Sequence, residues 1–194
     1  MVTGGGPDPR PLRADARRNR ARVLDAAEAV FAAKGTGAST EEVARRAGVG
    51  IGTVFRHFPT KEALLEAIVA GRLRRHAEEA DALAAAEDPG AALFGFLTRA
   101  VDQSATKLAF ADALAAAGVD VERALAESGR DLRRSLGALL ERAQRAGAVR
   151  DDVGVDELIA LLVGASRAAQ HAGQDPGLRS RTVAVVFDGL RPRR

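Results

Sequence analysis

The sequence predicts an all-α protein with a small basic head and a larger helical body. Apolar residues recur at helical spacing along most of the chain, and we find no strand-like alternation of useful length and no internal repeat. The charge is also divided unevenly. Residues 1–75 hold 14 Lys or Arg against 8 Asp or Glu, and the rest hold 15 against 18. The basic end suits a polyanion such as nucleic acid, and it also suits a membrane surface.

The composition narrows the class of protein. With 194 residues and 46% hydrophobic residues, the chain forms one domain or two small ones with an adequate core. It has no Cys, which excludes thiol catalysis, disulfides and Cys-based zinc sites, and only His57, His76 and His171 remain for a metal. We therefore expect no cofactor and no metal. The longest stretch without a charged residue, Pro89–Thr98, has ten residues, which is too short to span a bilayer. No secretory signal is visible, so we expect a cytoplasmic protein without membrane contact.

The first residues predict an arm followed by a helix. A triple glycine together with Pro7, Pro9 and Pro11 disfavours regular structure, so residues 1–16 are expected to form a flexible basic arm. Six Arg lie between Arg10 and Arg22, which favours binding to a polyanion. The alternative is that a chain rich in arginine simply has Arg at many solvent-exposed positions. The first helix is expected from about Arg17 to Lys34, and Gly35 ends it.

The next segment has the size and order of a helix-turn-helix. Ser39 and Glu42 form a capping-box pattern before a second helix that is expected to end at Ala47. Gly48 then supplies a residue able to adopt the positive φ of a tight turn. A short third helix is expected over residues 53–58, because Pro59 stops it. Such a unit presents its second helix to the major groove of DNA.

The remaining residues predict only further helices. One begins at Lys61 after the capping residue Thr60 and runs toward Leu83. Further helices are expected around residues 93–101, 108–117, 121–126, 132–146, 155–169 and 183–190. Breaks are expected at two turns, Asp88-Pro89-Gly90 and Asp175-Pro176-Gly177, and at the single glycines Gly118, Gly129, Gly147, Gly154 and Gly173.

The run from Gly48 to Leu64, GVGIGTVFRHFPTKEAL, resembles the DNA-binding head of TetR-family repressors. The usual family pattern is G-V-S-x-G-T-L-Y-x-H/Y-F-x-S/N-K-E-x-L, and the resemblance extends from Arg17 to about Ala70. It implies a homodimer whose heads bind the two half-sites of a palindromic operator on double-stranded DNA, and a C-terminal domain that binds an unknown small-molecule effector. The expected domains are thus the arm, a helix-turn-helix domain over residues 17–62, and a ligand-binding and dimerisation domain over residues 63–194.

The resemblance also implies which residues contact DNA. Arg56 would read a guanine edge in the major groove, while Thr53 and Lys61 would bind phosphate. Two departures lower the number of contacts, since Gly50 replaces the usual Ser and Phe55 the usual Tyr. We expect Phe55 and Phe58 to pack in the core, whereas His57 either lies near the groove or packs internally. The full implied set is Ser39, Thr40, Gly50, Ile51, Gly52, Thr53, Arg56, His57 and Lys61.

The body offers candidates for an effector site and for a dimer interface, and ordinary core packing is the alternative for both. The effector candidates are aromatic and polar residues on otherwise apolar helices: Phe94, Phe96, Gln103, Phe110, Arg167, Gln170 and His171. The dimer candidates form apolar stripes on the last two expected helices: Leu158, Leu161, Leu162, Ala165, Val183, Val186 and Phe187.

These observations predict a sequence-specific transcriptional regulator, a repressor released by its effector. The alternative is a helical protein that binds DNA without sequence preference, or an interaction protein, with no effector control. We do not expect an enzyme. The Gly48-x-Gly-x-Gly run is not a dinucleotide-binding loop, because no strand precedes it and its glycine spacing differs. The segment around Ser166 is not a nucleophile elbow, because it lies in a helical pattern with no preceding strand.

Overall fold

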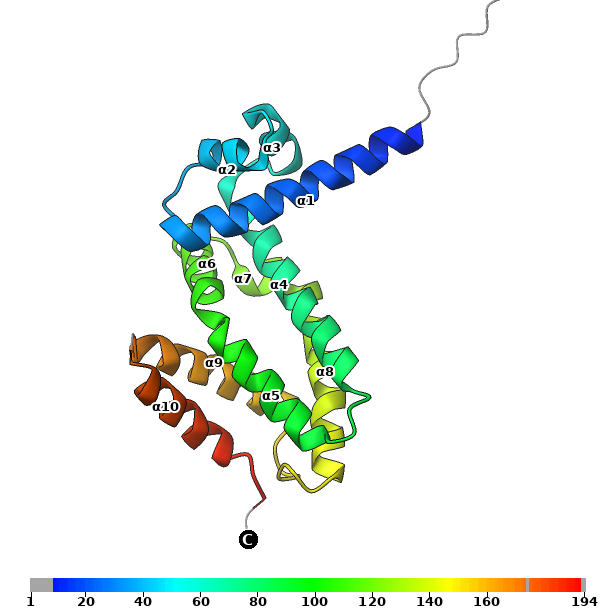
Figure 1. Ribbon diagram of the computed structural model, residues 1–194, viewed down its shortest axis with the longest axis vertical. Coiled ribbons are helices and arrows are strands. Elements are labelled where there is room, and N and C mark those ends of the chain that lie inside the picture. Colours follow the sequence, from blue (N-terminus) through cyan, green and yellow to red (C-terminus); the bar gives the residue numbers. More distant parts are fainter. Residues whose placement is uncertain (1–8, 174, 193–194) are drawn as a thin grey trace, which may run out of the picture. The chain divides into compact units, whose positions relative to one another are not determined.

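The part of the chain that the structure describes is built from helices, which confirms the predicted all-α class. The structure is a computed structural model and describes residues 9–173 and 175–192. Ten helices follow one another within these residues (Figure 1). They are α1 (Pro9–Lys34), α2 (Thr40–Ala47), α3 (Ile51–His57), α4 (Lys61–Leu83), α5 (Pro89–Asp102), α6 (Ser104–Ala116), α7 (Val121–Ala124), α8 (Ala126–Arg145), α9 (Val155–His171) and α10 (Pro176–Asp188).

The helices belong to two compact units. The first unit is Met1–Ile68 and the second is Val69–Arg194. The division falls inside α4, whereas the sequence led us to expect it between Glu62 and Ala63. Helix α4 continues from the first unit into the second without a break. The sequence therefore contains no turn or change in composition that marks the boundary.

Helix α1 begins earlier than expected, at Pro9 rather than near Arg17. The expected arm is therefore helical from Pro9 onward, and its residues 1–8 lie outside the described part of the chain. Proline is tolerated in a first helical turn, because the N–H groups there have no intrahelical acceptor. The following Leu, Arg and Ala residues are good helix formers, so they extend the helix.

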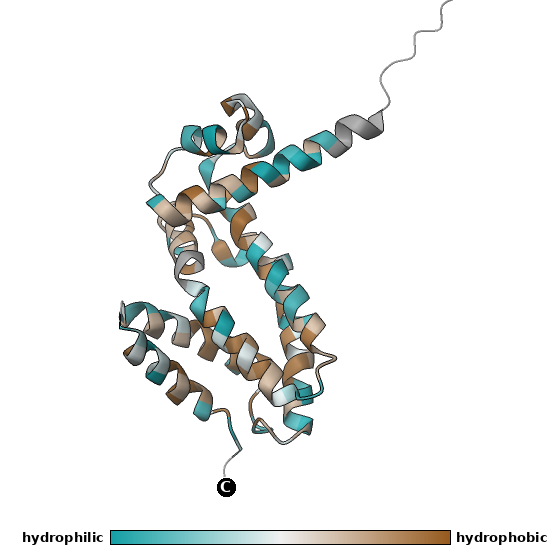
Figure 2. Cartoon of the chain, in the orientation of Figure 1, coloured by the Kyte–Doolittle hydropathy of each residue, from teal (hydrophilic) through white to brown (hydrophobic). Residues whose placement is uncertain are grey.

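In the first unit, α1 packs against α2 and α3, and α2 packs against α3. The buried side chains include Val23, Ala27 and Phe31 of α1, Val43 of α2 and Val54 of α3. In α1 these apolar residues follow an arginine-rich stretch, which Figure 2 shows as teal before the brown segment. The three helices thus bury one apolar face and leave the arginines of α1 from Arg17 to Arg22 exposed.

In the second unit, α5 packs against α6, α8 and α9, and α9 also packs against α10. Leu93, Phe96 and Leu97 of α5 are almost fully buried, as are Leu136 of α8 and Leu158 of α9. These side chains occur at helical spacing in the sequence. They form the core that holds the second unit together.

Two expected turns are helix starts in the structure. The Asp88 carboxylate accepts a hydrogen bond of 2.9 Å from the Ala91 N–H, and the Asp175 carboxylate accepts one of 3.0 Å from the Leu178 N–H. Each Asp is followed by a proline at the first position of the helix, α5 in one case and α10 in the other. The prediction that Gly129 breaks a helix is wrong, because Gly129 lies inside α8. The buried face of α8 outweighs the cost of about 1 kcal/mol for one internal glycine.

Candidate nucleic-acid interface and ligand cavity

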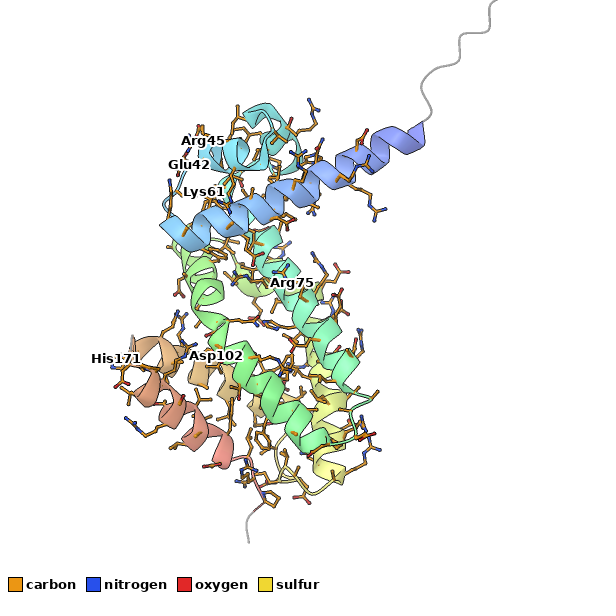
Figure 3. The ribbon with its side chains drawn as sticks, viewed as in Figure 1. Glu42, Arg45, Lys61, Arg75, Asp102 and His171 are labelled. Atoms are coloured by element: carbon orange, nitrogen blue, oxygen red, sulfur yellow. The ribbon has the colours of Figure 1, made fainter. Side chains whose placement is uncertain are left out.

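Helix α2 is fixed at both ends by the residues that the sequence singled out. The Ser39 hydroxyl accepts a hydrogen bond of 3.3 Å from the Glu42 N–H, and Gly48 adopts a left-handed φ of 65°. The Glu42 carboxylate was expected to reach back to Ser39. Lys34 and Arg45 bind this carboxylate, and Figure 3 shows Glu42 and Arg45 side by side. The hydrogen bond from Lys34 is the main reason that the pKa of Glu42 lies below its usual value, and a hydrogen bond from the Ser39 backbone also lowers this pKa.

The arginines of α1 include residues that hold the head together. Arg22 donates a hydrogen bond of 2.7 Å from Nη2 to the carbonyl oxygen of Ala47, at the C-terminal end of α2. The Arg20 guanidinium lies 4.9 Å from the centroid of the buried Phe58 ring. Part of the basic stretch is therefore structural, whereas Arg17 and Arg18 are exposed.

Helix α3 is anchored by one buried side chain and presents most of the others. Val54 is fully buried, and the helix ends where the Phe58 N–H donates a bond of 2.8 Å to the carbonyl oxygen of Val54. Gly50 precedes the helix in an extended conformation, without a side-chain cap. A Cβ atom built at Gly50 or at Gly52 meets no atom within 4 Å, so the start of α3 is open to an approaching ligand.

The candidate DNA-binding residues all lie in the first unit. They are on α2 and α3, at the residues that precede these two helices, and at the first residue of α4. Ser39, Gly50, Ile51, Gly52 and Arg56 are exposed, and Thr40, Thr53, His57 and Lys61 are half-buried. Among the described residues the Arg56 guanidinium has no hydrogen-bond or ion-pair partner. The Lys61 ammonium lies 5.6 Å from the centroid of the Phe31 ring.

The expectation that Phe55 packs in the core is wrong. Its side chain is 43% exposed, and Ile51, one helical turn earlier, is 37% exposed. Phe55 follows the buried Val54 directly, and consecutive helical residues point about 100° apart. The i, i+4 spacing of Ile51 and Phe55 was the available signal that they share a face away from the core.

The second unit contains a cavity of about 660 Å³, within the usual range for small-molecule sites. Helices α4 to α9 all contribute to its lining, which is largely apolar. The apolar lining residues are Leu73, Phe96, Ala100, Leu108, Val121, Leu125, Ala126, Leu132, Leu136, Ile159, Leu162 and Val163. The polar ones are His76, Ser104, Glu122, Arg130, Arg133 and Ser166.

The polar lining residues differ in whether their polar groups already have a hydrogen-bond or ion-pair partner. Ser104 donates a hydrogen bond of 2.7 Å to the carbonyl oxygen of Val101, and Arg133 forms an ion pair with Asp156. The His76 ring meets the Phe96 ring edge-on, with 5.9 Å between centroids. Ser166 is only 5% exposed, and its hydroxyl has no hydrogen-bond partner among the described residues. This hydroxyl is therefore available to a ligand.

Of the seven effector candidates, the structure places only Phe96 in the lining of this cavity. Phe110 is buried beneath the Arg72 guanidinium, 5.3 Å from the ring centroid, and Arg167 pairs with Asp112 at 2.5 Å. Phe94 lies beside Phe187, with 6.4 Å between ring centroids. Gln103 and His171 are exposed and Gln170 is half-buried, and Figure 3 shows His171 at the end of α9. Helical spacing predicts which residues share a face, but it does not predict which helices surround a cavity.

The dimer candidates fall into two groups. Leu158, Ala165, Val183 and Phe187 are covered by their own chain. Leu161 is exposed, whereas Leu162 and Val186 are half-buried. Three large apolar residues that are exposed lie on the same two helices and were not among the candidates: Val163, Leu178 and Val185.

None of the described helices is long and apolar enough to span a membrane. Nor does the described part of the chain contain a group of three or more His, Cys, Asp or Glu arranged to hold a metal.

A capped helix, a glycine turn and an open second helix, followed by a helical unit with an apolar cavity, are the features of a helix-turn-helix transcriptional regulator with a separate helical body. Family models match both parts. The family described as bacterial regulatory proteins, tetR family, matches residues 23–68, and the one described as transcriptional regulator SbtR-like, C-terminal domain, matches residues 88–192. The chain belongs to the TetR family of transcriptional regulators.

Solved structures agree with this assignment over nearly the whole chain. A TetR transcription regulatory protein from Mycobacterium vanbaalenii is 48% identical, covers 94% of this chain and 100% of its own, and has a TM-score of 0.72. A TetR transcriptional regulator from Streptomyces coelicolor is 35% identical over 90% of this chain and 99% of its own, with a TM-score of 0.69.

Curated relatives match about a third of the chain. The HTH-type regulators TtgW and SrpR of Pseudomonas putida are each 42% identical over 64 residues, which is 32% of this chain. The match spans 48% of TtgW and 30% of SrpR, less than two thirds of either protein.

Proposed function

We propose that the chain is a cytoplasmic repressor that binds a palindromic operator as a homodimer and leaves it when a small-molecule effector binds, without catalysing a reaction. The observation that carries this proposal is the combination of an open α3, with an unpaired Arg56, and an apolar cavity of about 660 Å³ in the second unit. One part is suited to bind DNA and the other to bind an apolar small molecule.

On DNA, the candidate residues of the head have distinct roles. Arg56 donates to a guanine edge, because its guanidinium is exposed and has no partner among the described residues. Thr53, Lys61, Ser39 and Thr40 bind phosphate and so position the head, and His57 lies at the edge of the groove. Phosphate contacts add affinity for every sequence, whereas base contacts select one.

The dimer forms through α9 and α10, which pack against each other within one chain. Leu161 of α9 and Leu178 and Val185 of α10 are exposed and apolar, and Val185 is 73% exposed. The half-buried Val186 is next to Val185, whereas Leu162 is half-buried and lines the cavity. A second copy of these two helices would cover this surface and complete a four-helix interface.

The effector is a largely apolar molecule with a hydrogen-bonding group for the Ser166 hydroxyl. Helix α4 carries its signal, since it begins at Lys61 in the head and supplies Leu73 and His76 to the cavity lining. An effector acts only if it binds one conformation better than another. It must therefore favour a position of α4 in which the separation of the two heads no longer matches the half-sites of the operator. An effector that changes operator affinity while the separation of the two heads stays constant would contradict this route.

Selection from a random duplex pool tests the proposal. The full chain is mixed with the pool at about 150 mM salt, where non-specific binding is weak, and the retained DNA is amplified and sequenced. We expect an inverted repeat to be enriched. Persistent retention of unrelated sequences would contradict sequence-specific function.

The second candidate function, DNA binding without sequence preference, is favoured by the exposed Arg17 and Arg18 of α1. A basic surface alone suffices for such binding. In that case the selected pool would retain DNA without a common sequence, and random duplex would compete fully for the bound protein.

A further inference from the structure

The head exposes two large apolar side chains on the helix that faces DNA. Ile51 is 37% exposed and Phe55 is 43% exposed. They are four residues apart in α3, so their Cβ atoms are about 5–6 Å apart on one face of the helix. Exposing such residues is unfavourable in water, and the fully buried side chain of α3 is that of Val54.

The surroundings of this pair indicate a polyanionic partner rather than an apolar one. Arg56 follows Phe55 directly and is exposed. Helix α2, which packs against α3, exposes Arg46 and also Arg45, which pairs with Glu42. A protein or membrane partner for the apolar pair alone would have to desolvate these cations. Duplex DNA instead pairs them with phosphates and brings its groove to the apolar pair.

The groove wall offers a specific apolar target. The C5 methyl group of thymine is the apolar group that base pairs present in the major groove, and the other groups there are hydrogen-bond donors or acceptors. Gly50 and Gly52 flank Ile51, and a Cβ atom at either would meet nothing within 4 Å. No side chain beside Ile51 therefore keeps the base edges at a distance.

We propose that Ile51 and Phe55 read thymines in the operator through their C5 methyl groups. This inference rests on the proposed function, because it assigns specificity to the same DNA-binding surface. Arg56 selects guanine by hydrogen bonds, whereas Ile51 and Phe55 select thymine by apolar contact. Replacing a thymine by uracil removes only the methyl group and keeps the base pair, so it isolates this contact.

The experiment uses the full chain and the DNA that selection from a random pool enriches. Each thymine of one half-site is replaced in turn by uracil, and affinities are measured by fluorescence anisotropy. We expect binding to weaken about fourfold at one or two thymine positions, the value for one methyl group removed from water. Ile51→Ala and Phe55→Ala should bind the thymine duplex more weakly and lose the sensitivity to uracil at their own position.

Phe55→Tyr is the matched control, because it keeps the ring and should keep the sensitivity to uracil. Both side chains are exposed, so the alanine variants should keep the helical circular dichroism spectrum and the melting temperature of the parent. The inference is overturned if every uracil duplex binds like the thymine duplex, if the enriched half-site contains no thymine, or if the alanine variants keep the full uracil effect. Failure to enrich any sequence would instead contradict the proposed function, and the inference with it.

Discussion

Single residues of the head divide between those that hold the fold and those that we propose to contact DNA, and neighbours often differ in role. Arg22 bonds a carbonyl at the end of α2, whereas Arg56 has no partner in the described structure. Val54 is buried, and Phe55 beside it is exposed. Residue type alone therefore does not identify a contact with DNA, because the direction of the side chain decides it.

Arg56 and Lys61 should affect DNA binding in different ways. Arg56→Ala is expected to cost about 1–3 kcal/mol on the operator and to relax the preference at one base pair, because it removes a base contact. Lys61→Ala is expected to weaken binding to all sequences alike and to lower the salt slope by about one per site. Anisotropy titrations on operator and random duplex at several salt concentrations measure both effects. Equal losses on the two duplexes for Arg56→Ala would remove its base-reading role.

Gly90 is required for close packing in the second unit. A Cβ atom at Gly90 would lie 2.6 Å from the Cβ atom of Ala148. Gly90→Ala should therefore destabilise the chain by about 1–3 kcal/mol in urea unfolding, in spite of the better helix propensity of alanine.

Two variants control for this effect. Ala148→Gly combined with Gly90→Ala should restore part of the loss, because it removes the second Cβ atom. Gly129→Ala, where a Cβ atom meets nothing within 4 Å, should be neutral or stabilising by up to about 1 kcal/mol. A Gly90→Ala chain as stable as the parent would show that this contact is not tight.

At the scale of elements, an exposed ion pair joins α6 to α9. Arg167 donates to the two oxygens of Asp112 at 2.5 and 2.7 Å, and mainly for this reason the pKa of Asp112 is lowered. The ion pair therefore stabilises the fold above the pKa of an unfolded aspartate, about 3.9, and this stabilisation is lost as the pH falls through the lower folded-state pKa.

Asp112→Asn should consequently lower the melting temperature by about 1–3 °C at pH 7, since exposed pairs contribute little. The difference from the parent should shrink below about pH 4. Thermal melts across this pH range measure the difference. Asp188→Asn is the control, because Asp188 is exposed and pairs with Arg191, three residues away on the chain. A difference that stays constant down to pH 3 would contradict the assigned role of the carboxylate.

The exposed apolar surface of α9 and α10 gives a test of the dimer. Val185→Asp is expected to shift the sedimentation coefficient from dimer to monomer without loss of helicity, because Val185 is 73% exposed in the single chain. Phe187→Asp is a contrasting control, since Phe187 is 7% exposed and its replacement should unfold the chain. A Val185→Asp protein that remains dimeric would place the interface elsewhere.

Helix ends were predictable where a cap or a glycine marks them. Ser39, Gly48 and Pro59 gave the limits of α2 and α3 to within two residues. Helix α1 begins earlier than predicted. Prolines close together predict an arm, but a first helical turn also tolerates them. The cavity was not predictable, since six helices line it and no local pattern states which helices meet. Phe96 is the one effector candidate in that lining.

At the scale of the whole molecule, the proposal joins a cavity in one unit to DNA binding in the other. Gly129 lines the cavity, and a Cβ atom there meets nothing within 4 Å, so Gly129→Leu should fill the space without distorting α8. Titration with the fluorophore 8-anilinonaphthalene-1-sulfonate, whose aromatic rings bind apolar sites, should show several-fold weaker binding, while operator affinity is retained. Gly129→Ala is the matched control. Unchanged binding of the fluorophore would exclude this cavity as its site.

The central claim is that the head binds one DNA sequence in preference to others. Its most direct measurement is fluorescence anisotropy of the full chain on the enriched inverted repeat, competed with a scrambled duplex at about 150 mM salt, where non-specific dissociation constants are about 10⁻⁴–10⁻⁶ M. We expect nanomolar binding with at least two subunits per site and weak competition by the scrambled duplex. Equal binding of both duplexes would contradict the claim.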